Sequence, residues 1–374
     1  LSRLGAGRVV VLERGRIGEG TGAQSSGILR THYSVPQNVA LAQASWRVFE
    51  DFAGYVDDPQ ASAGLVRCGY LIAAPAGERA AALAASLQGQ RDQGIAVQVL
   101  DAAQARERLP IARFDDAALI GYEPDAGYAD AHLTATGFAR AARRLGVRIL
   151  EGQAALGLLV DGDRVGGVRT AHGDWHARTV VSVQNIWSTE LAAWCGIALP
   201  VVAERHRVLA LQVDSAPYTP DMPVFKDLGS PGMIYTRSYG RSQMLVSEGN
   251  AGEVLATPDT APGAIDDDMV LHIAQQAAQR FPAYAEAALA AAWTGVYDVT
   301  PDWNPVLGPL PGLRGLVAGF GFSGHGFKLS PAVGRVLAQC ALGLPTDVDL
   351  APYALSRFGQ GRLLVGRYGA GAVS

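Results

Sequence analysis

The sequence predicts an α/β (α+β) protein that combines a parallel βαβ unit with a larger sheet. Residues 7–13 form a run of β-branched residues that ends in an acid, which is typical of a buried parallel strand. Residues 315–320 form a second buried strand that runs into a glycine-rich loop and then a helix. Residues 201–250 alternate between apolar and polar positions, which predicts the strands of another sheet.

Composition narrows the class of protein. With 374 residues, of which 49% are hydrophobic and 18% charged, the chain can bury a sizeable core in one large domain or two intertwined ones. The net charge of −4 gives no reason to expect a nucleic-acid partner. No run of about 18 uncharged apolar residues is present, so we expect no membrane span. Three cysteines far apart in the sequence favour reduced thiols in a cytoplasmic protein: Cys68, Cys195 and Cys340.

The first strand carries a candidate nucleotide ligand at its end. Residues 1–4 resemble the last turn of a helix that Gly5 and Gly7 close, and the following strand ends in Glu13. In a nucleotide-binding βαβ unit, such an acid follows a Gly-x-Gly-x-x-Gly loop by about 20 residues and accepts hydrogen bonds from a ribose. We therefore expect that loop to precede Leu1 and the chain to begin inside the first crossover helix. A strand ending in an ordinary solvated glutamate is the alternative.

A loop of small residues follows at residues 20–30. Its glycines and serines allow the backbone to approach a ligand closely and to present amide and hydroxyl donors. The loop is not a P-loop, because no Gly-Lys-Ser/Thr sequence follows it. A flexible surface turn is the alternative interpretation.

The middle of the chain is predicted to alternate between helices and strands. Helical spacing of apolar residues predicts a helix at residues 36–57, and an Ala-rich stretch predicts one at residues 77–93. Further helices are predicted at residues 132–145 and 266–281, the last with an acidic N-terminal cap. Short apolar runs predict strands at residues 69–72, 117–122, 147–150, 156–160, 166–170 and 179–183. His172 and His176 flank a predicted hairpin turn in this region, so we expect no metal site there.

Residues 293–343 carry the strongest functional signal. A buried strand leads into the glycine-rich loop 321–328, and Ser330 and Pro331 suit the cap and first position of a helix that ends at Gly343. The N-terminus of this helix would present unpaired amides and a partial positive charge to an anion beside the loop.

The same glycine-rich loop has a second interpretation. Residues 321–324 resemble the nucleophile elbow of serine hydrolases, which exposes a reactive serine between a strand and a helix. That motif needs a glycine where His325 stands, so we reject a serine hydrolase.

Taken together, these elements resemble the D-amino-acid oxidase superfamily, and within it the sarcosine oxidase and dimethylglycine dehydrogenase group. The resemblance rests on the strand ending in Glu13, on Ser25-Ser26-Gly27-Ile28, on Thr300-Pro301-Asp302 and Pro305-Val306-Leu307-Gly308, and on Gly324-His325-Gly326-Phe327-Lys328. It implies a Rossmann-like FAD-binding domain, discontinuous in sequence, packed on a substrate domain with a mostly antiparallel sheet. We expect residues 1–65, 130–200 and 293–374 in the first domain, and 66–129 and 201–292 in the second.

The resemblance also implies which residues bind FAD. Glu13 resembles the ribose ligand, and Arg14 beside it belongs to the same site. The other implied ligands are Trp187 and two loops along the pyrophosphate and the isoalloxazine ring: Ser25, Ser26, Gly27, Ile28, Gly324, His325, Gly326, Phe327 and Lys328. A reduced flavin carries negative charge near N1 and O2, which the helix N-terminus would stabilise.

The catalytic pocket is implied in the same way. Arg30 and Lys328 fall where sarcosine oxidases hold the substrate carboxylate, and two cations would fix that group while the adjacent C–N carbon faces flavin N5. A structural salt bridge for Arg30 and a solvated helix-start side chain for Lys328 are the alternatives. The other candidates for the pocket are His32, Tyr33, Tyr235, Arg237, Tyr239 and His325.

The sequence departs from the family pattern in three places. Gly295 stands where monomeric sarcosine oxidases carry the cysteine that bonds to flavin, so we expect non-covalent FAD. Met244 or Leu245 replaces the strand lysine credited with activating oxygen, which leaves room for a dehydrogenase that uses an acceptor protein instead of O2. The strand that usually ends in Ala-Gly-x-Trp has Gln-Asn-Ile-Trp at residues 184–187, so its contact with the flavin differs.

The predicted function is oxidation of the C–N bond of a small amine or N-methyl amino acid. Hydride transfer from the carbon next to nitrogen to the flavin would give an imine that water hydrolyses, with no metal and no covalent protein nucleophile. Two alternatives stay open. One is FAD-dependent oxidation of a 2-hydroxy acid, which needs a base such as His32 or His325. The other is a catalytically silent flavin-binding subunit of a larger complex.

Overall fold

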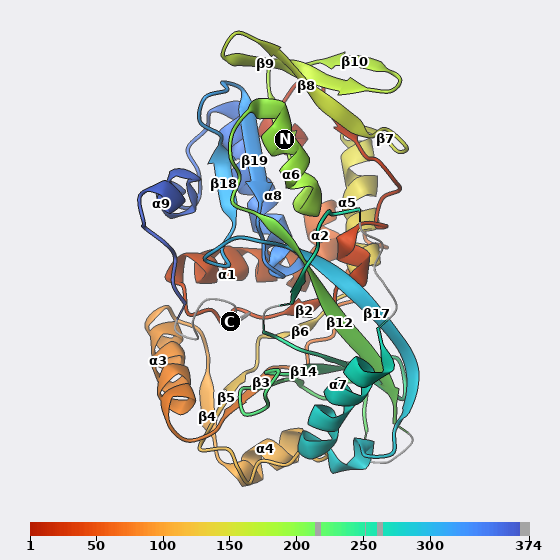
Figure 1. Cartoon of the computed structure of the whole chain (residues 1–374), viewed down its shortest axis with the longest axis vertical. Helices are drawn as coiled ribbons and strands as arrows, with labels where there is room; N and C mark the ends of the chain where they lie inside the picture. The colour runs from red at the N-terminus through yellow and green to blue at the C-terminus, as the bar shows by residue number, and fades with distance from the viewer. Residues whose placement is uncertain (214–217, 251, 260–264, 367–374) are drawn as a thin grey trace.

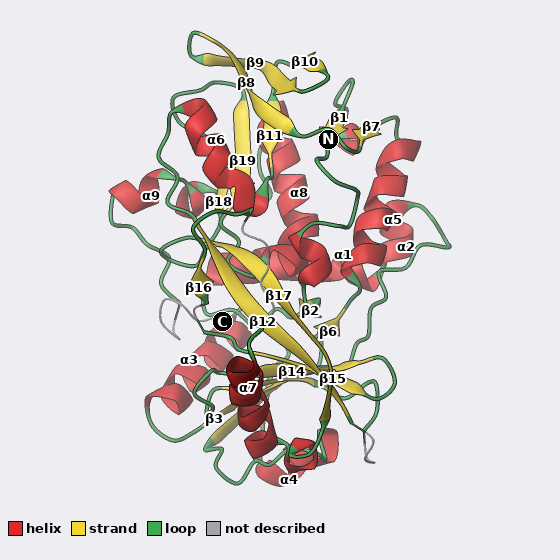
Figure 2. Ribbon diagram, turned by 45° about the vertical axis from the view of Figure 1, so that its right-hand side comes forward, coloured by secondary structure: helices red, strands yellow, loops and turns green. Residues whose placement is uncertain are grey.

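The computed structural model describes residues 1–213, 218–250, 252–259 and 265–366, and it confirms the α/β fold. The elements gather into an upper and a lower lobe in the view of Figure 1. A long antiparallel ribbon runs from one lobe into the other (Figures 1 and 2), formed by β12 (Val202–Gln212) and β17 (Ala288–Val299). The expected domain ranges also include residues 214–217, 251, 260–264 and 367–374, which lie outside the described residues.

The upper lobe contains the parallel pairs that the first and last strands predict. Two strands pair in parallel near the start of the chain: β1 (Val10–Leu12) and β7 (Arg148–Leu150). The prediction that this first strand is buried is wrong, because in this two-stranded sheet Val10 and Val11 are 37% and 39% exposed. A second sheet joins β11 (Val180–Ser182) in parallel to β19 (Leu316–Phe320), which pairs with antiparallel β18 (Val306–Pro309). The predicted hairpin-rich stretch forms β8 (Ala155–Asp161), β9 (Arg164–Thr170) and β10 (Gly173–His176). Its last apolar run, residues 179–183, leaves that stretch as β11.

Helices pack around these sheets: α1 (Pro36–Glu50), α2 (Phe52–Val56), α5 (Ala131–Arg144), α6 (Ser188–Cys195), α8 (Gly326–Leu342) and α9 (Ser356–Gly359). The segment predicted as one helix over residues 36–57 is two helices, α1 and α2. The chain leaves the helical conformation at Asp51, whose φ is −123°, and the Asp51 carboxylate accepts a hydrogen bond from the Gly54 amide at 3.0 Å. This cap restarts the helix in a new direction.

The last long helix, α8, begins earlier than the sequence predicts. We expected Ser330 to cap it and Pro331 to open it, but α8 begins at Gly326 and Pro331 lies inside it. A proline in this position cannot donate a hydrogen bond to the carbonyl of Phe327 four residues back. The hydroxyl of Ser330 donates to that carbonyl at 2.9 Å, so the carbonyl keeps a partner and the helix continues through the proline.

A mostly antiparallel sheet forms the lower lobe. Its strand order is β16-β12-β15-β14-β13-β3-β5-β4, with β17 beside β12, and the β13–β3 pair is parallel. Besides β12 and β17, the strands of this sheet are β3 (Tyr70–Ala74), β4 (Gln98–Leu100), β5 (Leu119–Glu123), β13 (Val224–Asp227), β14 (Tyr235–Tyr239), β15 (Gln243–Ser247) and β16 (Glu253–Val254). Its helices are α3 (Glu78–Asp92), α4 (Ala102–Arg108) and α7 (Asp267–Arg280). The sequence did not predict β4 or α4. A short pair, β2 (Ile28–Leu29) with β6 (Gly127–Tyr128), accompanies this sheet.

The two faces of the lower sheet meet different cores. Leu71, Ala73 and Phe225 point to one face and pack with Phe281 and with residues of α4. Residues at the alternate positions point to the other face. There Tyr70, Ile72 and Val224 share a core with Leu329 and Val333 of α8. The second face is therefore turned towards the upper lobe, and the candidate site lies on that side.

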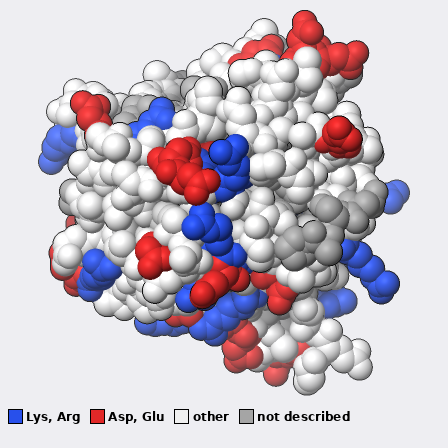
Figure 3. Space-filling view, turned by 90° about the horizontal axis from the view of Figure 1, so that it is seen from below, with Lys and Arg blue, Asp and Glu red and all other residues white. Residues whose placement is uncertain are grey.

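The surface gives two further observations. Seen from below, acidic and basic side chains lie side by side, with no large region of a single charge on that face (Figure 3). Within the described part of the chain, no helix is both long enough and apolar enough to cross a lipid bilayer.

Candidate active site

Two parallel strands of the upper lobe end at the same edge. β11 and β19 pair from Val180 with Leu316 to Ser182 with Ala318, so their carboxyl ends point the same way. Ligands bind at such edges in open parallel sheets. Three buried polar atoms at the end of β11 and just beyond it have no hydrogen-bond partner: Ser182 Oγ, Gln184 Oε1 and Ser188 Oγ. Because buried polar groups are nearly always hydrogen-bonded, these atoms indicate a polar ligand at this edge.

The glycine-rich loop after β19 is held closely against β17. Gly324 has a φ of +82°, and a Cβ there would lie 2.6 Å from the Cε2 atom of Tyr297, so the position requires glycine. Ser323 is also left-handed, with a φ of +48°, and its amide donates to the carbonyl of Asp298 at 2.9 Å. The loop delivers the free amides of the first turn of α8, from Gly326, to the edge where β19 ends.

The loop of small residues near the N-terminus is built for close approach. Gly27 has a φ of +67°, and a Cβ there would lie 2.1 Å from the carbonyl oxygen of Ala129. The Gly27 amide donates to Ser25 Oγ at 3.0 Å, which fixes the turn into β2 and Ile28. Ser26 Oγ is buried and has no hydrogen-bond partner, while the Arg237 guanidinium donates to the Ser26 carbonyl. The loop therefore offers an unused buried hydroxyl to a ligand.

Arg14, which follows Glu13 directly beyond the end of β1, contacts Trp187. The Gly15 amide donates to Glu13 Oε1 at 2.8 Å. The Arg14 guanidinium lies 4.7 Å from the centre of the Trp187 ring, and the indole of Trp187 donates to Asp259 Oδ1 at 2.9 Å. Sequence reasoning missed Asp259, because no local pattern connects residue 259 with the first strand.

Arg30 is a buried cation without a carboxylate partner. Its side chain is 4% exposed, and its guanidinium lies 4.7 Å from the ring centre of Tyr33 and 5.6 Å from that of Tyr70. It donates to the carbonyl of His32, and the salt bridges found among the described residues do not include it. The alternative of a structural salt bridge for Arg30 therefore has no partner in the described part of the chain.

Glu123 holds the backbone next to Arg30. Its Oε1 accepts hydrogen bonds from the Thr31 amide at 2.7 Å and the Thr31 hydroxyl at 2.6 Å, and its Oε2 accepts from the His32 amide at 3.1 Å. Burial raises the pKa of the Glu123 carboxyl to about 7, although these hydrogen bonds and the charge of Arg30 oppose that shift. The sequence analysis did not single out Glu123, since it lies on a strand 90 residues away from its partners.

The two histidines of the region are held neutral. His325 Nδ1 lies 2.9 Å from the hydroxyl of Tyr33, and its Nε2 is buried without a partner. Burial, together with the charges of Lys328 and Arg30, holds the pKa of His325 well below its usual value. Burial and the charge of Arg30 lower the pKa of His32 to about 3. Both rings therefore stay uncharged at neutral pH.

Two lysines share the region with Arg30. Lys328 lies in the first turn of α8 and is 8% exposed, so it is not a solvated side chain. Burial, with the charges of Arg30 and Lys226, holds its pKa well below the usual range. Lys226 on β13 is 3% exposed, its Nζ has no hydrogen-bond partner, and burial together with Arg30 lowers its pKa to about 7. The sequence analysis missed Lys226, although a lysine inside a strand pattern was a usable signal.

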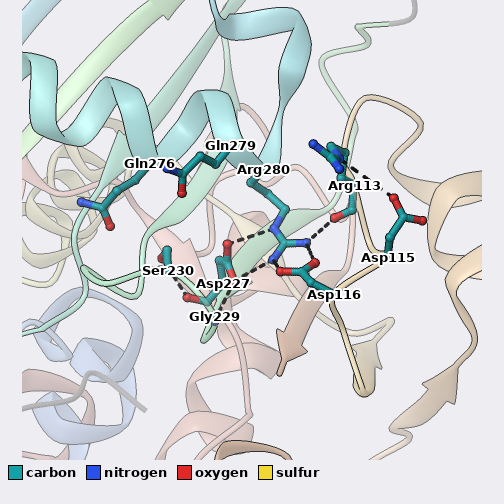
Figure 4. Close-up of a pocket in the computed structure, with 9 residues that line it drawn as sticks. All are labelled: Arg113, Asp115, Asp116, Asp227, Gly229, Ser230, Gln276, Gln279 and Arg280. Carbon is teal, nitrogen blue, oxygen red and sulfur yellow. Dashed lines mark hydrogen bonds and ion pairs between the residues drawn. The ribbon is translucent and has the colours of Figure 1, made fainter. Parts of the chain in front are cut away.

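Arg280 on α7 shows how this protein pairs a buried arginine elsewhere. Its guanidinium donates to both oxygens of Asp116, at 2.8 and 2.9 Å, and to both oxygens of Asp227, at 2.9 and 3.1 Å (Figure 4). These groups line a pocket of about 390 Å³. Asp227 follows Lys226 directly, but it points to the opposite face of the sheet. The carboxylate nearest to Lys226 in sequence is therefore committed to Arg280.

The remaining candidates lie at the margin of this region. Tyr239, at the end of β14, is 43% exposed. Its ring centre lies 5.5 Å from the Arg237 guanidinium and 6.4 Å from the centre of the Trp293 ring. Leu245 pairs with Arg237 across β15 and β14, so it points to the same face as Arg237, whereas Met244 packs in the core of the other face. Leu245 is thus the residue that stands on the site-facing side of β15.

The site residues fit FAD, the cofactor that the resemblance implies. The hydroxyls of Ser26, Ser182 and Ser188 are buried without partners and can donate to phosphate or ring oxygens. The free amides and positive end of α8 lie beside the loop that carries His325, where negative charge on a flavin would be stabilised.

Comparison with known proteins identifies the family. Residues 1–340 match the family described as FAD dependent oxidoreductase. The chain is 26% identical over 383 residues to sarcosine oxidase subunit beta of Arthrobacter sp., covering 99% of this chain and 89% of that protein. L-proline dehydrogenase from P. horikoshii superposes with a TM-score of 0.87 and 23% sequence identity, covering 97% of this chain and 94% of that one. Glycine oxidase from Geobacillus kaustophilus superposes with a TM-score of 0.80 and 25% sequence identity, covering 94% of this chain and 92% of that one. The chain therefore belongs to the family of FAD-dependent oxidoreductases, with FAD as its cofactor.

Proposed function

We propose that this oxidoreductase oxidises the C–N bond of a small amino acid or N-methyl amino acid. The observation that carries the proposal is a pair of buried cations, Arg30 and Lys328, that have no carboxylate partner among the described residues. A buried charge without a partner is costly, so a bound anion is the natural partner for both. The carboxylate of an amino acid supplies that anion and brings its amine with it.

The remaining residues of the pocket would hold this substrate in a defined orientation. Arg30 is fixed by Tyr33 and Tyr70, so its guanidinium can bind a carboxylate through two parallel hydrogen bonds. FAD, when bound, accepts the hydride from the carbon next to nitrogen. His325 is neutral and anchored to Tyr33, so its unpartnered Nε2 can donate to or accept from a polar group without adding charge.

The cofactor would lie along the residues that the sequence predicts. Glu13 would accept from the ribose, Arg14 and Trp187 would flank the nucleotide, and Ser26 would donate to a phosphate or ring oxygen. The support is the contact of Arg14 with Trp187, next to Glu13 in the sequence, and the unpartnered Ser26 hydroxyl. Residues 1–65, 130–200 and 293–374 would then form the FAD-binding domain, and 66–129 and 201–292 the substrate domain.

The electron acceptor is proposed to be a protein or another carrier rather than O2. Leu245 stands on the site-facing side of β15 and is one of the two residues, with Met244, that the family resemblance implies in place of the oxygen-activating lysine. Sarcosine oxidase subunit beta, which this chain resembles over nearly its full length, is by its name one subunit of an assembly.

An anaerobic absorbance titration tests the proposal. The FAD-loaded protein is titrated with sarcosine and other N-methyl amino acids, and separately with proline and glycine. The flavin absorbance bands at about 370 and 450 nm are followed. Bleaching by any of these amines supports C–N oxidation, and slow recovery in air compared with an artificial acceptor supports a dehydrogenase.

The other outcomes separate the alternatives. Bleaching by 2-hydroxy acids alone would contradict the proposal. We do not expect it, because His32 and His325 are weak bases in their buried setting. Full FAD content without bleaching by any amine, unless a partner protein is added, would indicate a catalytically silent subunit.

A further inference from the structure

This chain has two lysines, and both are buried. Only two of its 31 basic residues are lysines, Lys226 and Lys328, and the others are arginines. Both lysines are more than nine-tenths buried, at 3% and 8% exposure. The two lysines therefore both lie at buried positions, and these positions face one region. Lysine carries a compact ammonium group that can lose its proton when it is buried, whereas arginine stays charged.

The sheet places Lys226 on the same face as the Arg30 site. Val224 pairs with Tyr70 and Lys226 with Ile72, and alternate residues of a strand share a face, so Lys226 and Tyr70 point the same way. The Arg30 guanidinium lies over the Tyr70 ring at 5.6 Å. On its other side Lys226 pairs with Tyr235, and its Nζ lies 5.7 Å from the centre of that ring.

The amine of Lys226 has room but no partner. A Cβ at Gly249 would fall 1.8 Å from Lys226 Nζ, so the glycine leaves the space that the amine occupies. The Nζ atom is buried without a hydrogen-bond partner, and Asp227 beside it is engaged with Arg280 on the other face. The tyrosine ring of Tyr235 offers only its face. Since the described residues offer no acceptor for this amine, a bound ligand is the group that would supply one.

Charge balance indicates the number of carboxylates in that ligand. Arg30, Lys226 and Lys328 act on one another as like charges, and Glu123, paired with Tyr70 across β3 and β5, is the carboxylate that faces them. Three cations against Glu123 and one substrate carboxylate leave one positive charge unmatched. A second substrate carboxylate makes the set neutral when all these groups are ionised.

Resting on the proposed function, we infer that Lys226 forms a second carboxylate subsite beside Arg30 and Lys328. The substrate class is then a dicarboxylic amino acid, such as an N-alkyl aspartate or glutamate, rather than a neutral amino acid. One carboxylate binds Arg30 and Lys328, the amine faces the flavin, and the second carboxylate binds Lys226.

Kinetics with matched substrates test the inference in the FAD-loaded enzyme. The pairs are racemic N-methylaspartate with N-methylasparagine, and N-methylglutamate with N-methylglutamine, which differ by one charge at nearly constant shape. In one of the two pairs we expect the acid to exceed its amide by at least about 30-fold in kcat/KM for flavin reduction, the value of a good charge-assisted pair. In Lys226→Met that ratio should fall to about threefold or less.

The outcomes distinguish this inference from the proposed function. If sarcosine and the amides reduce the flavin as well as the acids do, the proposed function stands and the subsite is wrong. If Lys226→Met slows acids and amides by the same factor, Lys226 does not recognise the second carboxylate and the inference fails. If no amine reduces the flavin in the wild type, the proposed function itself fails.

A second measurement does not depend on the variant's folding. Because the chain has two lysines, biosynthetic [ε-13C]lysine gives two side-chain signals, whose shifts report protonation of Nζ. The protein is titrated with the non-oxidisable diacid 2-(methylthio)succinate or its 4-amide at about pH 8, above the lowered pKa of Lys226.

The two ligands give different expected spectra. The diacid should move both lysine signals towards the protonated shift, because a carboxylate beside Lys226 counters Arg30 and Lys328. The amide should move one signal. Identical spectra with the two ligands would overturn the inference.

Discussion

At the scale of the residue, the candidate site is a group of buried ionisable side chains: Arg30, Lys328, Lys226 and Glu123. Arg30 and Lys328 were predicted from their positions in a family pattern, and the structure finds both buried with no carboxylate partner in the part of the chain that it describes. Lys226 and Glu123 were not predicted, because each lies on a strand whose local pattern indicates only burial. Their significance comes from facing Arg30 across the sheet, and that arrangement depends on strand pairing that local sequence does not encode.

Removal of the Arg30 charge should weaken substrate binding more than cofactor binding. Arg30→Met is expected to lower kcat/KM for carboxylate-bearing amines by about a hundredfold or more, because Lys328 and Lys226 alone cannot replace a bidentate contact. Anaerobic stopped-flow reduction measures this loss, with FAD content as the internal reference. Arg241→Met, a substitution of an exposed arginine, is the control. Equal losses in the two variants would contradict the role of Arg30.

Glu123 should make stability depend on pH. Its folded pKa of about 7 lies above the usual 4.5, so the folded state binds more protons between these values. The stabilisation that Glu123 contributes, roughly 3 kcal/mol, is therefore fully present below about pH 4.5 and is lost as pH rises through 7. Asp298, whose pKa burial also raises to about 7, adds a similar slope.

The variant Glu123→Gln isolates this contribution. Because glutamine does not titrate, the free energy of unfolding of the wild type relative to that of the variant should fall by roughly 3 kcal/mol between pH 5 and pH 8, whatever the other groups contribute to both proteins. Urea unfolding of the FAD-loaded proteins across that range measures the two slopes. Parallel profiles for the two proteins would show that Glu123 does not carry the effect.

At the scale of the element, the sequence predicted those helices and strands whose signal is local. The helices α3, α5 and α7 lie within a residue or two of the predicted ranges. Two errors have local physical causes that the pattern hides. Asp51 caps a new helix inside a continuous apolar stripe, and Ser330 satisfies the carbonyl that Pro331 leaves free. Short elements such as β4 and α4 lacked enough residues for a periodic signal.

The turn into β2 should depend on glycine at one position. Gly27→Ala places a Cβ 2.1 Å from the Ala129 carbonyl at a left-handed φ, so we expect a loss of about 3 kcal/mol or no folded protein. Gly22→Ala meets no atom within 4 Å and should change stability by about 0.5 kcal/mol or less. Thermal unfolding of the FAD-loaded variants measures both. A Gly27→Ala variant as stable as Gly22→Ala would contradict the geometry.

At the scale of the whole molecule, the fold class was predictable but the assembly of its sheets was not. The parallel strand pattern and the glycine-rich loops indicated the α/β class. The pairing of β11 with β19 joins segments from the middle and the end of the chain, and no local pattern specifies such a partner. The same holds for β13 beside β3, the pairing that brings Lys226 to the site.

The cofactor should leave the unfolded chain freely. Gly295 pairs with His206 in the β12–β17 ribbon and offers no side chain for attachment to the flavin. Acid precipitation of the holoprotein is therefore expected to release essentially all of the FAD into the supernatant, where its absorbance is measured. Flavin fluorescence that stays with the protein band after denaturing electrophoresis would contradict non-covalent binding.

The β12–β17 ribbon also restricts how the two lobes can move. Eleven residues of β12, from Val202 to Gln212, pair with β17 along the whole path between the lobes. A clamshell opening would have to bend or unzip this ladder, whereas loops can shift without breaking it. The lobes should therefore keep their relative orientation while substrate enters and product leaves.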